Sequence, residues 1–109
     1  MGLFDQEQQS LSQLKSGDRL ANICKLAGLE KRNKKDGEPF LMLLLMDQSG
    51  KLKGKVWNNV NKFYKILELG EIFKFTGTVT EYKGELDSRI SDIEKADPSE
   101  YKPEDFIEK

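Results

Sequence analysis

The sequence contains no histidine, a single cysteine, and no apolar run near the roughly 20 residues of a membrane span. Without histidine it lacks the most common general base, the Ser–His pair and most zinc sites. Neither the P-loop motif G-x-x-x-x-G-K-[ST] nor the dinucleotide-binding motif G-x-G-x-x-G occurs. Cys24 has no partner for an internal disulfide, and its apolar neighbours predict a buried thiol. We therefore expect no catalytic residues, no metal, no cofactor and no membrane partner, and we expect a cytoplasmic protein that is not an enzyme.

The 109 residues fit one domain with one modest core. We expect this domain over residues 14–97. Residues 1–13 are expected to form an N-terminal arm or a short helix, and residues 98–109 an acidic C-terminal tail or linker.

Charge is unevenly distributed, although the net charge is only −1. Residues 31–65 contain nine cations against three anions, whereas residues 92–109 contain seven anions against three cations. Because attraction of a polyanion depends on the local field, the basic middle of the chain is compatible with contact to nucleic acid.

The stretch from Phe40 to Trp57 predicts two strands joined by a tight turn. Its first half is almost wholly apolar, and Asp47, Ser49 and Gly50 are residue types that favour a turn. In its second half, small and apolar residues alternate with lysine and tryptophan, as in a strand with two different faces. We expect Leu52, Gly54 and Val56 on the inner face, and Lys53, Lys55 and Trp57 on the outer face.

Before this hairpin, residues 19–30 predict a long first strand. Its alternation slips near Ile23 and Cys24, and Gly28 falls inside it, which favours a bulge or a sharp bend. Residues 31–39 predict a polar loop.

After the hairpin, residues 58–69 predict a helix, with Asn58 or Asn59 at its start and Gly70 at its end. Its apolar stripe consists of Val60, Phe63, Tyr64 and Leu67. Strands are then expected over residues 72–82 and 85–96.

This order of elements predicts an all-β fold, a five-stranded OB barrel with one helix between strands three and four. An open α+β sheet is the alternative.

Aromatic and basic side chains are expected to gather on the outer face and on two flanking loops. OB barrels bind single strands by stacking bases on exposed rings while cations contact phosphates. The predicted nucleic-acid-binding residues are Lys31, Arg32, Lys34, Lys35, Phe40, Met42, Lys53, Lys55, Trp57, Tyr82 and Lys83. Other readings stay open: Trp57 could pack on the helix, the basic loop could be merely solvated, and the strand lysines could protect a strand edge.

Five short motifs carry a family resemblance. They are KSGD at 15–18, GEPFL at 37–41, LMDQSG at 45–50, VW at 56–57 and GTVTEYKG at 77–84. Together they resemble the OB-fold nucleic-acid-binding domain that precedes the HD phosphohydrolase domain of bacterial YhaM-type exoribonucleases. Since that family's catalysis resides in the HD domain, the resemblance implies a binding module for single-stranded RNA or DNA. We expect it to be part of, or derived from, a larger nucleic-acid-processing protein.

Two features depart from that family. The outward positions of the strand at 40–47 are all apolar: Phe40, Met42, Leu44 and Met46. Asp87 and Ser88 stand where a glutamine and an apolar residue are common. The apolar outer face supports an alternative function, a protein-interaction or self-associating OB module that does not bind nucleic acid.

Overall fold

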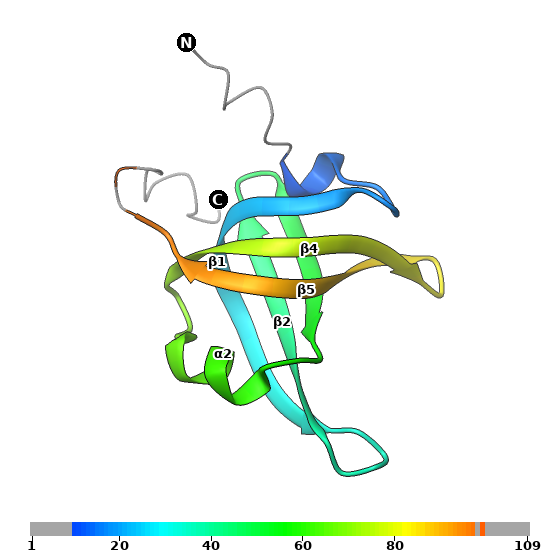
Figure 1. Cartoon of the computed structure of the whole chain (residues 1–109). Coiled ribbons are helices and arrows are strands. Elements are labelled where there is room, and N and C mark those ends of the chain that lie inside the picture. The colour runs from blue at the N-terminus through cyan, green and yellow to red at the C-terminus, as the bar shows by residue number, and fades with distance from the viewer. Residues whose placement is uncertain (1–9, 98, 100–109) are drawn as a thin grey trace.

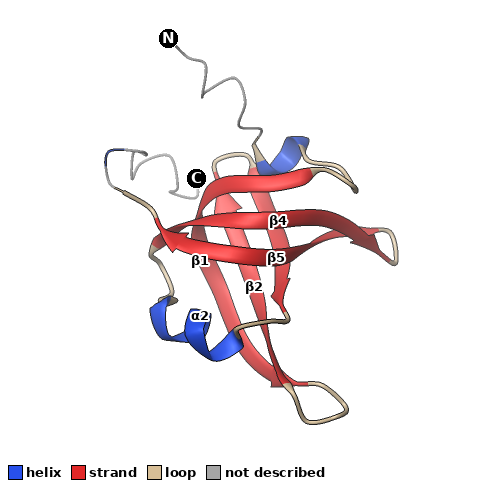
Figure 2. Cartoon of the chain, viewed as in Figure 1, coloured by secondary structure: helices blue, strands red, loops and turns tan. Residues whose placement is uncertain are grey.

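The computed structural model describes residues 10–97 and 99, in which five strands form a closed barrel (Figure 1). Among these residues, the single α-helix lies between the third and fourth strands, beside one end of the barrel (Figure 2). The elements are the 3₁₀ helix η1 (Leu11–Gln13), β1 (Arg19–Asn33), β2 (Pro39–Asp47), β3 (Gly50–Val56), α2 (Val60–Ile66), β4 (Ile72–Tyr82) and β5 (Glu85–Lys95). This architecture confirms the predicted OB barrel. Within the described residues, no helix is long and apolar enough to span a membrane.

Strand β1 is long enough to pair with two neighbouring strands. Its first half pairs with β4 and its second half with β2, and the register with β2 shifts between Leu26 and Gly28. This confirms the bulge expected near Gly28, but the slip expected near Ile23 and Cys24 was wrong, because pairing with β4 continues without a shift from Arg19 to Lys25. The expected end of β1 was wrong, because pairing with β2 continues to Asn33 opposite Pro39. Lys31 and Arg32 therefore belong to the strand and not to the loop.

The barrel closes through a short parallel contact between β3 and β5, which pairs Lys55 with Arg89 and Val56 with Ile90. The Ser88 hydroxyl donates a hydrogen bond to the Lys53 carbonyl at 2.8 Å. A Cβ on Gly54 would lie 3.0 Å from that hydroxyl oxygen, so the absence of a side chain there lets the two strands approach.

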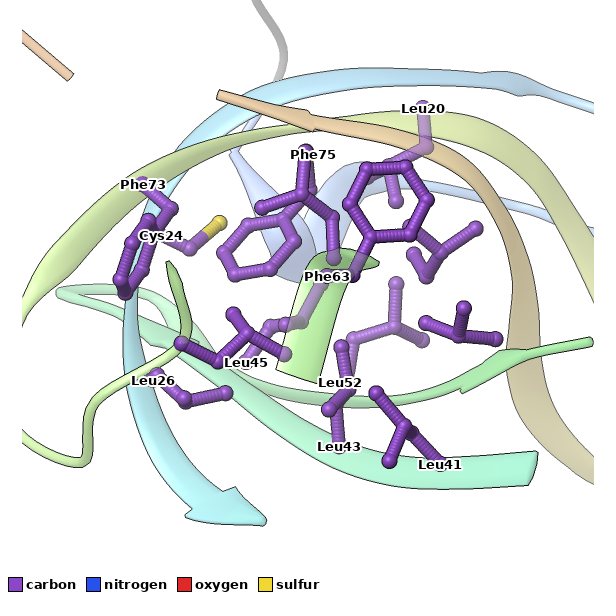
Figure 3. Packing of buried hydrophobic residues seen from close by; sticks show 14 of the residues in the cluster. Leu20, Cys24, Leu26, Leu41, Leu43, Leu45, Leu52, Phe63, Phe73 and Phe75 are labelled. Carbon is purple, nitrogen blue, oxygen red and sulfur yellow. The ribbon is translucent and has the colours of Figure 1, made fainter. Parts of the chain in front are cut away.

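The core fills the barrel with inward-facing side chains of all five strands (Figure 3). Phe73 and Phe75 are fully buried with their rings edge to face, and Cys24 is a buried free thiol as expected. Phe63 of α2 closes one end of the core. Burial raises the pKa of the Cys24 thiol, so this group stays protonated and inert.

Helix α2 is shorter than expected, beginning at Val60 and ending at Ile66. Asn59 occupies the N-cap position in a left-handed conformation, with φ 56°, and its side chain forms no capping hydrogen bond. Val60 and Phe63 are buried as expected, but Tyr64 is 42% exposed. The sequence predicted too many buried positions on this helix, because so short a helix turns only one narrow side toward the barrel.

The 3₁₀ helix η1 is fastened to the turn between β2 and β3. The Leu11 N–H donates to the Asp47 carboxylate at 2.9 Å, and the Ser12 N–H donates to the Ser49 hydroxyl at 3.0 Å. Leu11 is buried in the core cluster together with Leu14. The rest of the expected N-terminal arm and nearly all of the expected acidic tail lie outside the described residues, so the predicted domain limits stay predictions.

Strand β5 differs from its expected pattern. Leu86 is 36% exposed, whereas Asp87 and Ser88 are buried. Ser88 and Ile90 point inward across from Gly54, and the register with β4 then shifts between Thr76 and Gly77. Asn22 is a further buried polar residue, although the sequence offered only apolar candidates for the interior of β1.

Candidate nucleic-acid interface

Two aromatic side chains meet where β2 begins and β3 ends. The last paired residues of the two strands are Leu41 and Val56, so Phe40 and Trp57 follow as the next cross-strand neighbours. Their rings stack with centroids 4.7 Å apart and an interplanar angle of 20°. Both side chains are half-buried. Trp57 lies one residue beyond β3, not within it as expected from the sequence.

A cation and an open hollow adjoin this stack. The Lys34 ammonium lies 5.6 Å from the centroid of the Trp57 ring, close enough for a cation–π interaction. Trp57, Lys34 and Lys62 line a hollow of about 550 Å³ between the β1–β2 loop and the start of α2. Lys35 is also exposed in that loop. The hollow therefore offers a ring and two cations to the same ligand.

The lysines in the middle of β3 lie opposite carboxylates of β5. Lys53 Nζ is 3.3 Å from a carboxylate oxygen of Glu85, and Lys55 Nζ is 3.1 Å from one of Asp87. The first pair is well exposed, whereas the side chains of Lys55 and Asp87 are only 28% and 12% exposed. Parallel pairing of β3 with β5 produces both pairs. The two lysines do lie on the outer face, but their charge is largely compensated there.

Tyr82 and Lys83 are placed at the β4–β5 turn. Tyr82 is the last residue of β4 and is 60% exposed, so it does not belong to the loop in which it was expected. The ammonium groups of Lys55 and Lys83 lie 5.5 and 5.3 Å from the centroid of its ring. This turn therefore adds an exposed aromatic ring flanked by cations.

Lys31 and Arg32 turn to different sides of β1. Arg32 pairs across the strands with Phe40, and its guanidinium lies 2.9 Å from the Glu30 carboxylate. That hydrogen bond raises the pKa of Arg32. Lys31 instead places its ammonium 5.0 Å from the centroid of the Tyr64 ring on α2. Because successive side chains of a strand point to opposite sides, these two cations, adjacent in sequence and predicted to lie in one basic loop, are separated in space.

The outward side chains of β2 beyond Phe40 are apolar, as expected. Met42 and Leu44 are half-buried, and Met46 is buried at 7% exposure. Leu44 lines two open hollows of about 410 and 340 Å³, one shared with Leu69 and the other with Leu86. Met42 lies opposite Lys55 in the ladder, next to the charged part of the face.

Sequence reasoning missed the acidic partners on β5 and the asparagines beside Trp57. Asp87 had been noted as unusual, but its pairing with Lys55 depends on a strand 32 positions away in sequence and could not be inferred locally. Asn58, Asn59 and Asn61 line the hollow with exposed side chains. Across the part of the chain that the structure describes, no three potential metal-ligating side chains gather into a site.

Solved structures with this arrangement share little sequence with the chain. The second OB-fold domain of replication protein A from Methanococcus maripaludis is 20% identical, with a TM-score of 0.64 over 82% of this chain and 94% of that one. PriB from Ralstonia solanacearum is 17% identical, with a TM-score of 0.62 over 73% and 98%. The mitochondrial single-stranded DNA binding protein Rim1 from S. cerevisiae is 11% identical, with a TM-score of 0.62 over 76% and 100%.

A family match extends beyond the likeness in fold. The tRNA anti-codon family, described as an OB-fold nucleic acid binding domain, matches residues 25–96, which include β2, β3, α2, β4 and β5. The match covers most of the face built around Phe40 and Trp57. The chain therefore belongs to this family of OB-fold nucleic acid binding domains.

Proposed function

We propose that this chain binds single-stranded nucleic acid across the outer face of β2 and β3 and the two loops beside it. The observation that carries this proposal is the stack of Phe40 on Trp57 outside the barrel core. A large ring held on the surface by a second ring is already oriented for stacking, so little conformational entropy is lost when a base joins it.

Phosphates are bound by the cations around this stack. Lys34 and Lys62 line the hollow beside Trp57, and Lys83 lies with Tyr82 at the other end of the face. Stacking and phosphate contacts are available to every base, so these two contributions carry little sequence preference. The match of the family and the fold of Rim1 support this function.

A finer assignment follows from the motifs in the sequence. The chain corresponds to the binding domain of a YhaM-type exoribonuclease and acts in the cytoplasm as a binding module, while catalysis resides elsewhere. The GEPFL and LMDQSG motifs that support this assignment cover the end of the β1–β2 loop and the β2–β3 turn, both next to the proposed site. RNA is then the preferred strand.

One titration tests these statements together. Labelled RNA and DNA strands of equal length and sequence are titrated with the protein at two ionic strengths, while fluorescence anisotropy and the emission of Trp57 are recorded. Trp57 is the sole tryptophan, so quenching on binding reports directly on stacking. We expect saturable binding that weakens at higher salt, quenching of Trp57, tighter binding of RNA, and strands that stay full length on a gel.

Each failure has its own meaning. Absence of binding at low salt refutes the proposed function, and binding without quenching removes Trp57 from the site. Equal affinity for RNA and DNA, or a preference for DNA, contradicts the finer assignment. Shortening of the strands contradicts the role as a binding module.

A second proposal concerns the apolar outer face of β2. Leu44 lines two open hollows together with Leu69, which is 58% exposed, and Leu86. This apolar surface binds another copy of the chain or a protein partner beside the nucleic-acid site. Sedimentation of wild type and Leu44→Lys at several concentrations tests self-association. A monomer at every concentration excludes a second copy as the partner.

A further inference from the structure

The hollow beside Trp57 combines an aromatic ring with hydrogen-bonding side chains. Its volume of about 550 Å³ lies within the range of sites that hold small organic groups, about 300–1,000 Å³. Asn58 and Asn59 line it from the segment that enters α2, Asn61 lines it from the first turn of α2, and Glu38 lines it from the β1–β2 loop. All four side chains are exposed and accessible to a ligand.

Building on the proposed function, we propose that this hollow holds one base of the bound strand and prefers adenine, cytosine or guanine to uracil or thymine. Unstacked bases in single strands are recognised by stacking on an aromatic ring and by hydrogen bonds to their edges. The hollow supplies both, since Trp57 is its ring and the asparagine amides and the Glu38 carboxylate are its edge-reading groups.

The preference follows from the chemistry of Glu38. An ionised carboxylate only accepts hydrogen bonds, whereas an asparagine amide both donates and accepts. Adenine, cytosine and guanine carry an exocyclic amino group that donates to a carboxylate, as cytosine N4 does in other complexes. Uracil and thymine carry no amino group, and their one edge donor, N3–H, is flanked on both sides by carbonyl oxygens that repel a carboxylate. The asparagines accommodate every base, so the discrimination depends on Glu38.

The position of Glu38 among cations supports this role. Among the residues that line the hollow, which include Lys34 and Lys62, Glu38 is the only carboxylate. Its backbone is held in place, because the Glu38 carbonyl accepts a hydrogen bond from the Lys34 N–H at 2.7 Å and its N–H donates to Asp36 at 3.0 Å. The loop therefore holds the Glu38 backbone in place at the hollow that Trp57 also lines.

The test compares ratios of affinity, which removes effects common to all strands. Oligo-U, oligo-C and oligo-A of equal length are titrated with wild type and with Glu38→Gln. Wild type is expected to bind oligo-C and oligo-A about fivefold or more tightly than oligo-U, the discrimination of one base contact. In Glu38→Gln the new amide donates to uracil O4, so the ratio falls toward one while affinity for every strand is maintained or rises.

Matched variants separate this effect from simple loss of charge. Glu94→Gln removes an equal charge from an exposed position of β5, far from the hollow in sequence, and is expected to leave the ratio unchanged. Asn61→Ala removes one amide from the hollow and is expected to weaken all strands by a similar factor. Thermal denaturation confirms that each variant is folded.

The outcomes distinguish this inference from the proposed function. If no strand binds or quenches Trp57, the proposed function itself fails. If all strands bind and quench Trp57 but Glu38→Gln keeps the wild-type ratio, the base preference is refuted and the binding function stands. A change in the ratio of equal size in Glu94→Gln also refutes the role of Glu38.

Discussion

The outer face holds the lysine of the β1–β2 loop and the lysines of β3 in opposite ways. Near Trp57, the ammonium of Lys34 lies 5.6 Å from the centroid of an indole ring, which attracts a cation and leaves its charge intact. Along the strand, Lys53 and Lys55 face carboxylates at 3.3 and 3.1 Å, which cancel their charge locally. A count of cations along the sequence therefore overestimates the positive field of this face. The neighbouring strand, not the lysine itself, decides where a phosphate is attracted.

This comparison has its largest consequence at the aromatic end. Trp57→Ala is expected to weaken binding of a single strand by roughly tenfold or more, because stacking contributes about 1–3 kcal/mol per base. Fluorescence anisotropy of a labelled strand measures the affinity. The free energy of unfolding is expected to fall by about 1 kcal/mol, the scale of the lost stack with Phe40.

Tyr64→Ala is the matched control for Trp57→Ala. It removes an exposed ring that also lies near a lysine, but on α2, away from the stack. The control should bind like wild type. Equal losses in both variants would show that the aromatic end of β3 has no special role.

The ion-paired lysines of β3 are tested by freeing Lys55. Asp87→Asn keeps the size of the side chain and its acceptor for the Ser88 N–H, which lies 2.7 Å from the carboxylate, but it removes the charge that faces Lys55. Affinity at low salt is expected to rise a few-fold. The slope of log affinity against log salt should steepen by about 0.7, the change for one added phosphate contact on a single strand.

This gain comes with a loss of stability, because a partly buried ammonium loses its partner. Thermal denaturation should show a decrease of about 1 kcal/mol in the free energy of unfolding. Asp92→Asn, at an exposed position of the same strand, provides the control for removal of one negative charge. If both variants raise affinity equally, the effect is one of net charge and Lys55 is not masked by Asp87.

Much of the fold was predictable, because it depends on local patterns. Strand β4 has the predicted bounds, the inner and outer faces of β3 are as expected, and the bulge lies at Gly28. Each is set by alternation of apolar residues or by a glycine. The narrow buried side of α2 and the continuation of β1 to Asn33 were missed, because both depend on what packs against the element rather than on the element itself.

The site was predictable as a set of residue types but not as a set of contacts. Alternation alone placed Lys53 and Lys55 outward, and both do lie there. Their ion pairs arise from the parallel contact of β3 with β5, which no local sequence pattern predicts. The stack of Phe40 on Trp57 likewise depends on the register of the β2–β3 hairpin beyond its last hydrogen-bonded pair. The contacts that the sequence did not predict are those that depend on the register between strands far apart in the chain or beyond the last paired residues.

The smallest expected effect distinguishes two lysines that look alike in sequence. Lys34→Ala is expected to reduce the salt slope by about 0.7, because a cation with an uncompensated charge is lost from the phosphate path. Lys53→Ala should reduce it by less, since Glu85 stays beside the strand and the local net charge that meets the phosphate is already near zero. The Lys53–Glu85 pair is exposed and contributes at most about 1 kcal/mol to stability, so neither substitution should unfold the protein. Affinities measured over a series of salt concentrations give both slopes. A larger change for Lys53→Ala than for Lys34→Ala would mean that a phosphate displaces Glu85 and that the lysines of β3 contribute to binding at least as much as the loop lysine.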